Sequence, residues 1–120
     1  MHDFQEPIKV LDALKSDKPL EASVLRVMSH YFHMISEKSA RLFVEKNERY
    51  DASFFRQCVE DGDLSSVPTR LTDKLNRFKS LVKNPDLDNT DESVKDTLVD
   101  LANYATMALV FLELMEIDKE

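Results

Sequence analysis

Residues 89–116 read NTDESVKDTLVDLANYATMALVFLELME, and this stretch decides the fold. At about 100° per residue, Asp96, Asp100 and Asn103 fall on one side of a helix. Leucine and alanine side chains fill a wider second face, and the acidic side continues toward the C-terminus as Met107 and Phe111. A helix that is apolar over most of its circumference is normally central to a small bundle. We therefore expect this helix to carry both the core and the functional site.

The composition predicts an all-α protein. The 120 residues include one glycine and four prolines, and 42% are hydrophobic. So few chain breakers favour long helices, and the length fits one domain spanning residues 1–120. The net charge of −7 argues against a nucleic-acid surface or a membrane surface as partner, because both need a basic stripe. The single cysteine, with no signal-like segment and no uncharged apolar run, indicates a cytoplasmic protein.

Helical periodicity divides the chain into a short N-terminal helix within residues 1–19 and a core bundle in residues 20–120. We expect three main helices and short ones besides, arranged as a compact bundle that completes its core by homo-oligomerisation. The short helices cover residues 7–16 and a segment that ends at Gly62. The main helices cover residues 20–49, 69–83 and 89–116, with Ser66 and Pro68 at the start of the second.

The helix at residues 20–49 has an apolar arc that we expect to face the core. Its members are Val24, Leu25, Met28, Tyr31, Phe32, Ile35, Leu42 and Phe43. Lys46 and Tyr50 continue the same line. A lysine at a core-facing position needs a partner, such as a carboxylate or a phosphate.

The carboxylates of the last helix lack local partners. No basic residue lies three or four positions from Asp96 or Asp100, so their partner comes from another helix or from a bound ion. Helix-borne carboxylates with waters suit Mg²⁺ or Mn²⁺, usually together with substrate phosphates. The alternative is that Glu92 only completes a cap begun by Asn89, while Asp96 and Asp100 pair with Lys46, Lys74 or Arg77.

Basic and amide side chains on the other helices form the natural counterpart of these carboxylates. They are Lys46, Asn47, Tyr50, Lys74 and Arg77. Lysine and arginine recognise phosphate, and Asn or Tyr can hydrogen-bond a base or sugar. The alternative is an ordinary exposed basic face. His30 and His33 have no third ligand for a metal, and Cys58 among aromatics fits a buried small residue.

Three stretches together resemble the nucleotide modification associated domain 1 family, small helical proteins common in phages and prophages. They are KNERYD at 46–51, RLTDKLNR at 70–77 and DESVKDTLVDLANYA at 91–105. The resemblance covers roughly residues 28–113, and the last stretch is the most specific. That family in turn looks like the all-α nucleoside triphosphate pyrophosphatases of the MazG and helical dUTPase group, which hold Mg²⁺ on helix-borne carboxylates.

The resemblance implies a nucleotide-binding protein, with Glu92, Asp96 and Asp100 on the metal side and with catalytic roles for Asp96 and Asp100. Lys46, Asn47, Tyr50, Lys74, Arg77 and Asn103 would face the nucleotide. The first expectation is thus a Mg²⁺-dependent nucleoside triphosphate pyrophosphohydrolase of phage or prophage nucleotide metabolism.

Two alternatives remain open beside this expectation. One is a non-catalytic nucleotide-binding or protein-interaction module, and the other is a purely structural helical oligomer. Basic residues paired with Asp96 and Asp100 would favour the non-catalytic module.

Overall fold

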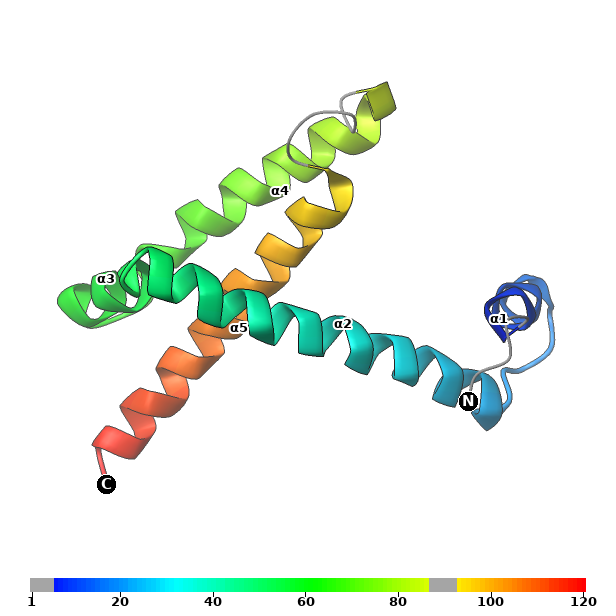
Figure 1. Cartoon of the computed structure of the whole chain (residues 1–120), viewed down its shortest axis with the longest axis horizontal. Coiled ribbons are helices and arrows are strands. Elements are labelled where there is room, and N and C mark those ends of the chain that lie inside the picture. The colour runs from blue at the N-terminus through cyan, green and yellow to red at the C-terminus, as the bar shows by residue number, and fades with distance from the viewer. Residues whose placement is uncertain (1–5, 87–92) are drawn as a thin grey trace. The chain divides into compact units, whose positions relative to one another are not determined.

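The computed structural model describes residues 6–86 and 93–120, with side chains from Lys9 onward in the first helix. These ranges contain helices and no strand, which confirms the predicted all-α class (Figure 1). The helices are α1 (Glu6–Lys15), α2 (Ala22–Arg49), α3 (Ser53–Asp61), α4 (Val67–Lys83) and α5 (Val94–Asp118).

The chain forms two units, Met1–Leu42 and Phe43–Glu120. The first contains α1 and most of α2. The second contains the last turns of α2 together with α3, α4 and α5. The division therefore falls inside α2.

The residues expected to start and stop the helices do so in the structure. Gly62 ends α3 with φ of 75°, and its N–H donates to the carbonyls of Cys58 and Val59. Only glycine enters this left-handed region without a steric penalty. Ser66 precedes α4, and Pro68 lies in its first turn, where the missing N–H has no partner to lose.

The start of α5 differs from the expectation. The predicted cap formed by Asn89 and Glu92 lies outside the described residues, and α5 begins at Val94, about five residues later than the periodicity suggested. Ser93 is the N-cap: its Oγ accepts from the Asp96 N–H at 3.1 Å, and Asp96 Oδ2 accepts from the Ser93 N–H at 3.4 Å. This reciprocal pair is a capping box.

The core of the unit Phe43–Glu120 lies where α3 and the start of α4 meet the C-terminal half of α5. Its buried members are Phe54, Cys58, Val67, Met107 and Phe111. Cys58 is fully buried, as expected for a small apolar residue, and burial raises the pKa of its thiol. Within this unit α4 and α5 lie side by side and run in opposite directions (Figure 1). Leu81 and Thr97 are buried toward the other end of this pair.

The predicted core-facing arc of α2 is not buried. No residue of this helix is buried, and Phe32 and Ile35 are 71% and 57% exposed. The periodicity identified an amphipathic helix correctly. The exposed fractions do not confirm the expectation of burial, because periodicity shows which face is apolar and not what covers it.

Helix α5 is likewise covered on one side only. Met107 and Phe111 face the core, while Leu109 on the opposite side is 63% exposed. By length and composition alone α5 could cross a membrane, with an 18-residue window of mean hydropathy 1.5. Every such window contains Asp100 or Glu113, and core helices of soluble proteins pass the same test.

Candidate functional site

Asp100 is the centre of the candidate site. Its Oδ1 lies 2.8 Å from Lys46 Nζ, and its Oδ2 lies 2.9 Å from Lys74 Nζ. The Asp100 side chain is 16% exposed, against 23% for Lys74 and 42% for Lys46. One half-buried carboxylate therefore serves two ammonium groups, and the trio carries a net charge of about +1 at neutral pH.

Three helices place these groups. Lys46 comes from the last turn of α2, Lys74 from the middle of α4 and Asp100 from the second turn of α5. All three belong to the unit Phe43–Glu120. The Asp100 carboxylate thus binds lysines from two other helices. The sequence predicted that its partner would come from another helix or from a bound ion.

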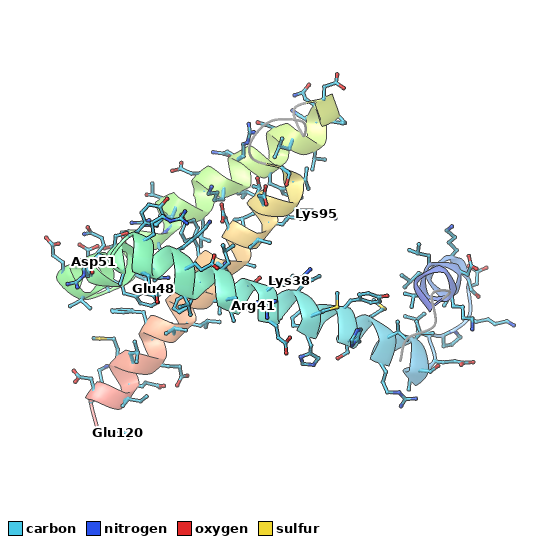
Figure 2. The ribbon with its side chains drawn as sticks, in the orientation of Figure 1. Lys38, Arg41, Glu48, Asp51, Lys95 and Glu120 are labelled. Carbon is cyan, nitrogen blue, oxygen red and sulfur yellow. The ribbon has the colours of Figure 1, made fainter. Side chains whose placement is uncertain are left out.

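A sharp corner between α2 and α3 fixes the end of α2 that carries Lys46. Asp51 and Ala52 both have positive φ, 52° and 53°, which is unusual for residues with a side chain. The Ala52 N–H donates to the Asn47 carbonyl, and Arg56 Nε donates to the Asp51 carbonyl at 2.8 Å. Glu48 and Asp51 mark this corner in Figure 2.

Opposing influences act on the Asp100 carboxyl. Burial raises the pKa of this carboxyl. The hydrogen bonds and positive charges of Lys46 and Lys74 lower the pKa by more than burial raises it, so it lies below its usual value. The carboxylate is therefore ionised at neutral pH. It holds the two lysines together by the same interaction that keeps it charged.

A small cavity opens beside this trio. It has a volume of about 40 Å³ and is lined by Phe43, Lys46, Asn47, Asp100, Asn103, Tyr104 and Met107. Asn47 Nδ2 donates to the Phe43 carbonyl at 2.8 Å and lies 3.7 Å from Met107 Sδ. The volume suits water molecules or a small polar group, and it is far below the ~300 Å³ at which typical small-molecule pockets begin.

Arg70 also lies in this region, although it was not among the site residues predicted from the sequence. Its guanidinium carbon lies 5.6 Å from the centre of the Phe54 ring and 5.9 Å from that of Tyr104. The two rings are stacked, with 10° between their planes. These contacts are cation–π interactions, which hold a positive charge one helical turn from Lys74.

The pairing of α4 with α5 has a simple register. Arg70 contacts Tyr104, and Lys74 contacts Asp100. Because the two helices are antiparallel, a step of four residues toward the C-terminus of α4 corresponds to a step of four residues toward the N-terminus of α5. The same register places the half-buried Arg77 level with Thr97. The i, i+4, i+7 spacing of Arg70, Lys74 and Arg77 is the sequence signal for this basic line.

The structure brings some of the predicted site residues together and separates others. Lys46, Asn47, Asp100 and Asn103 surround the cavity, and Lys74 reaches Asp100. Tyr50 is 60% exposed and does not line the cavity. Asp96 is exposed, and its carboxylate accepts from the Ser93 N–H. Glu92 lies outside the described residues.

The described side chains do not fit the expected magnesium site. Both oxygens of Asp100 are engaged by lysines, and Asp96 serves the cap of α5. Across residues 9–86 and 93–120, no group of three or more His, Cys, Asp or Glu side chains could hold a metal ion. A divalent cation prefers several oxygen ligands, and ammonium groups at the same carboxylate oppose it electrostatically.

A comparison with known protein families finds a match to the part of the chain that contains this site. The family model of nucleotide modification associated domain 1 matches residues 46–112, from Lys46 to Leu112 within α5, and the chain belongs to this family. No curated protein and no solved structure matches the chain. The matched region begins at Lys46 and includes Lys74 and Asp100, so the whole trio lies within the family domain.

Proposed function

We propose that this protein binds a nucleotide through its phosphate groups at Lys46 and Lys74 and does not hydrolyse it. The observation that carries the proposal is the single carboxylate shared by two lysines. Asp100 holds the Lys46 ammonium group where it is reached from solvent. A phosphate at the mouth of the site can bind there through charge-assisted hydrogen bonds.

Lys46 is the group through which the site meets solvent. Its ammonium group has three N–H donors, and its side chain is 42% exposed. A phosphate oxygen can therefore approach Lys46 while Asp100 keeps the lysine in place. The cavity is too small for a base, so the base lies outside it, where Asn47 and Asn103 offer amide groups at the rim.

The pairing supports the non-catalytic alternative over the hydrolase. Basic residues paired with Asp96 and Asp100 were expected of a non-catalytic nucleotide-binding or protein-interaction module, and Asp100 has such partners. Magnesium-dependent pyrophosphohydrolysis requires Asp100 to exchange both lysines for a metal ion, and the described residues form no group of three or more His, Cys, Asp or Glu side chains that could hold one. The family's association with nucleotide modification supports a nucleotide as the ligand.

Thermal-shift and calorimetric titrations with deoxy- and ribonucleoside triphosphates test the proposal, because a ligand that binds the native state raises its apparent stability. We expect at least one nucleotide to raise the melting temperature without added Mg²⁺. Lys46→Gln should abolish this shift. Lys95→Gln is the matched control, since Lys95 is an exposed lysine in the first turn of α5 (Figure 2).

A pyrophosphate-release assay with Mg²⁺ or Mn²⁺ completes the test. We expect no release. Release that disappears in Asp100→Asn would replace this proposal with the hydrolase. An absence of binding by every nucleotide, or equal binding by Lys46→Gln and wild type, would contradict it outright.

A further inference from the structure

The exposed face of α2 has a strict heptad pattern. Leu25, Met28, Phe32, Ile35 and Leu42 follow one another at alternating steps of three and four, with Ser39 at the fifth position of the series. Such a 3.5-residue repeat is typical of a helix that packs along another helix of the same repeat. The pattern covers the part of α2 within the unit Met1–Leu42.

Among the described residues of the unit Met1–Leu42, nothing buries this face. Leu25, Met28, Phe32 and Ile35 are between 38% and 71% exposed, and none of the residues of α2 is buried. A helix gains most of its stability from packing an apolar face, so a bare face of this length is unfavourable in water.

The heptad positions of α2 continue toward its C-terminus, where the next one contacts α5. One heptad step after Ser39 comes Lys46, which meets Asp100 on α5. Phe43 on the same side packs against the core of its unit. The same side of α2 is thus a helix-packing surface near its C-terminus and bare before it.

We propose that a second copy of this chain covers the face, with the two α2 helices antiparallel across a two-fold axis. The seam then pairs Leu25 with Leu42, Met28 with Ser39 and Phe32 with Ile35, each pair repeated by symmetry. Two of these layers set a large side chain against a smaller one, Met28 against Ser39 and Phe32 against Ile35. This is the interdigitation that knobs-into-holes packing needs.

Charge selects the antiparallel orientation. A parallel pair would stack Lys46 on Lys46 of the other copy at one seam position and Phe32 on Phe32 at another. The like charges would repel each other and compete for Asp100. The antiparallel pair places the two Lys46 side chains at opposite ends and leaves each with its own Asp100.

The area available is enough for such a dimer. Burying a large apolar side chain removes on the order of 100 Å² from water. Ten apolar seam side chains from two copies, with Val24, Tyr31 and the other flanking residues, bring the contact close to the ~1,000 Å² at which specific interfaces begin.

Sedimentation equilibrium of the whole chain from low to high micromolar concentration tests the dimer. We expect wild type to dimerise and Phe32→Glu to weaken dimerisation at least ~tenfold, because one charge would enter the seam from each copy. Met34→Glu is the control, since Met34 is 40% exposed on another side of the same helix. Circular dichroism of each variant shows whether its helices persist.

A monomeric wild type at all concentrations would overturn the proposal. A dimer that survives Phe32→Glu but is lost in Leu109→Glu would overturn it too, because it places the interface on α5. Both results are independent of nucleotide binding.

Disulfide cross-linking tests the orientation. We expect a Leu25→Cys/Leu42→Cys double variant to form a covalent dimer on oxidation and Leu25→Cys alone to form none. Cys58 is fully buried, so wild type serves as the silent background. Cross-linking by Leu25→Cys alone would show a parallel pair and overturn the antiparallel seam.

Discussion

At the scale of single residues, Asp100 differs from Asp96 although the two lie four positions apart on one helix. Asp96 is in the first turn of α5, where its carboxylate and backbone complete the cap with Ser93. Asp100 is one turn further along, level with Lys74, and is 16% exposed. The position along the helix, and not the side of the helix, decides which carboxylate enters the site.

Asp100→Asn should destabilise the protein by about 1–2 kcal/mol at neutral pH. Removing one partner of a buried ion pair leaves the other charge uncompensated, and the solvent access of Lys46 reduces the effect below the ~3–5 kcal/mol typical of full burial. Urea unfolding at pH 7 measures the change. Asp96→Asn is the matched control, for which we expect the smaller loss of a partly retained cap.

The effect of Asp100→Asn should also depend on pH. The pKa of Asp100 is lower in the folded protein than in the unfolded chain, so its stabilisation is present above the unfolded value of about 3.9 and is lost as the pH falls through the folded pKa. The difference in the free energy of unfolding between wild type and Asp100→Asn should therefore be largest at pH 7 and should shrink toward zero below pH 4. A difference that stays constant over this range would show that the ion pairs do not stabilise the fold.

At the scale of secondary-structure elements, the corner between α2 and α3 holds Lys46 and Asn47 in place. Ala52 has φ of 53° and ψ of 35°, a left-handed conformation that a Cβ disfavours. Nothing in the sequence pattern marks this strain, since neither Asp51 nor Ala52 is a glycine.

Ala52→Gly should stabilise the protein by about 0.5–1 kcal/mol, because glycine adopts this conformation without strain and loses part of the gain to its freer unfolded chain. Chemical denaturation gives the value. Ala102→Gly is the control: Ala102 is exposed within α5, so the same substitution there should destabilise by about 0.5–1 kcal/mol. Destabilisation by both would mean that the corner carries no strain.

At the scale of the whole molecule, a protein of net charge −7 must bind an anion through a local basic site. Under the proposed function the trio and the nearby Arg70 and Arg77 provide one, and all five residues lie within the family domain. We expect the overall charge to repel nucleic acids and other polyanions, while a compact anion can reach the site.

Nucleotide affinity should therefore fall several-fold when the salt concentration rises from about 0.05 to about 0.5 M, because the Debye length shrinks from above 10 Å to below 5 Å. Titration calorimetry at both salt concentrations gives the change. Duplex DNA should show no binding near physiological salt in a gel-shift assay. Salt-independent nucleotide binding would point to recognition of the base and contradict the phosphate site.

The sequence by itself determined the all-α class, the ends of α3 and α4 at Gly62, Ser66 and Pro68, and the need of Asp100 for a partner from another helix. These follow from local rules: φ at glycine, the missing N–H of proline, and the spacing of charges along a helix. Lys46 and Lys74 were among its candidate partners, so the trio was within reach of sequence reasoning.

Only the tertiary structure decided that both lysines share one carboxylate, that Asp96 belongs to a cap, and that the apolar side of α2 is bare. The register of α4 on α5 sets the first, and the true start of α5 at Val94 sets the second. The third depends on what packs against α2. Periodicity gives the direction of a side chain around its own helix, whereas contact depends on the height and position of the neighbouring helix.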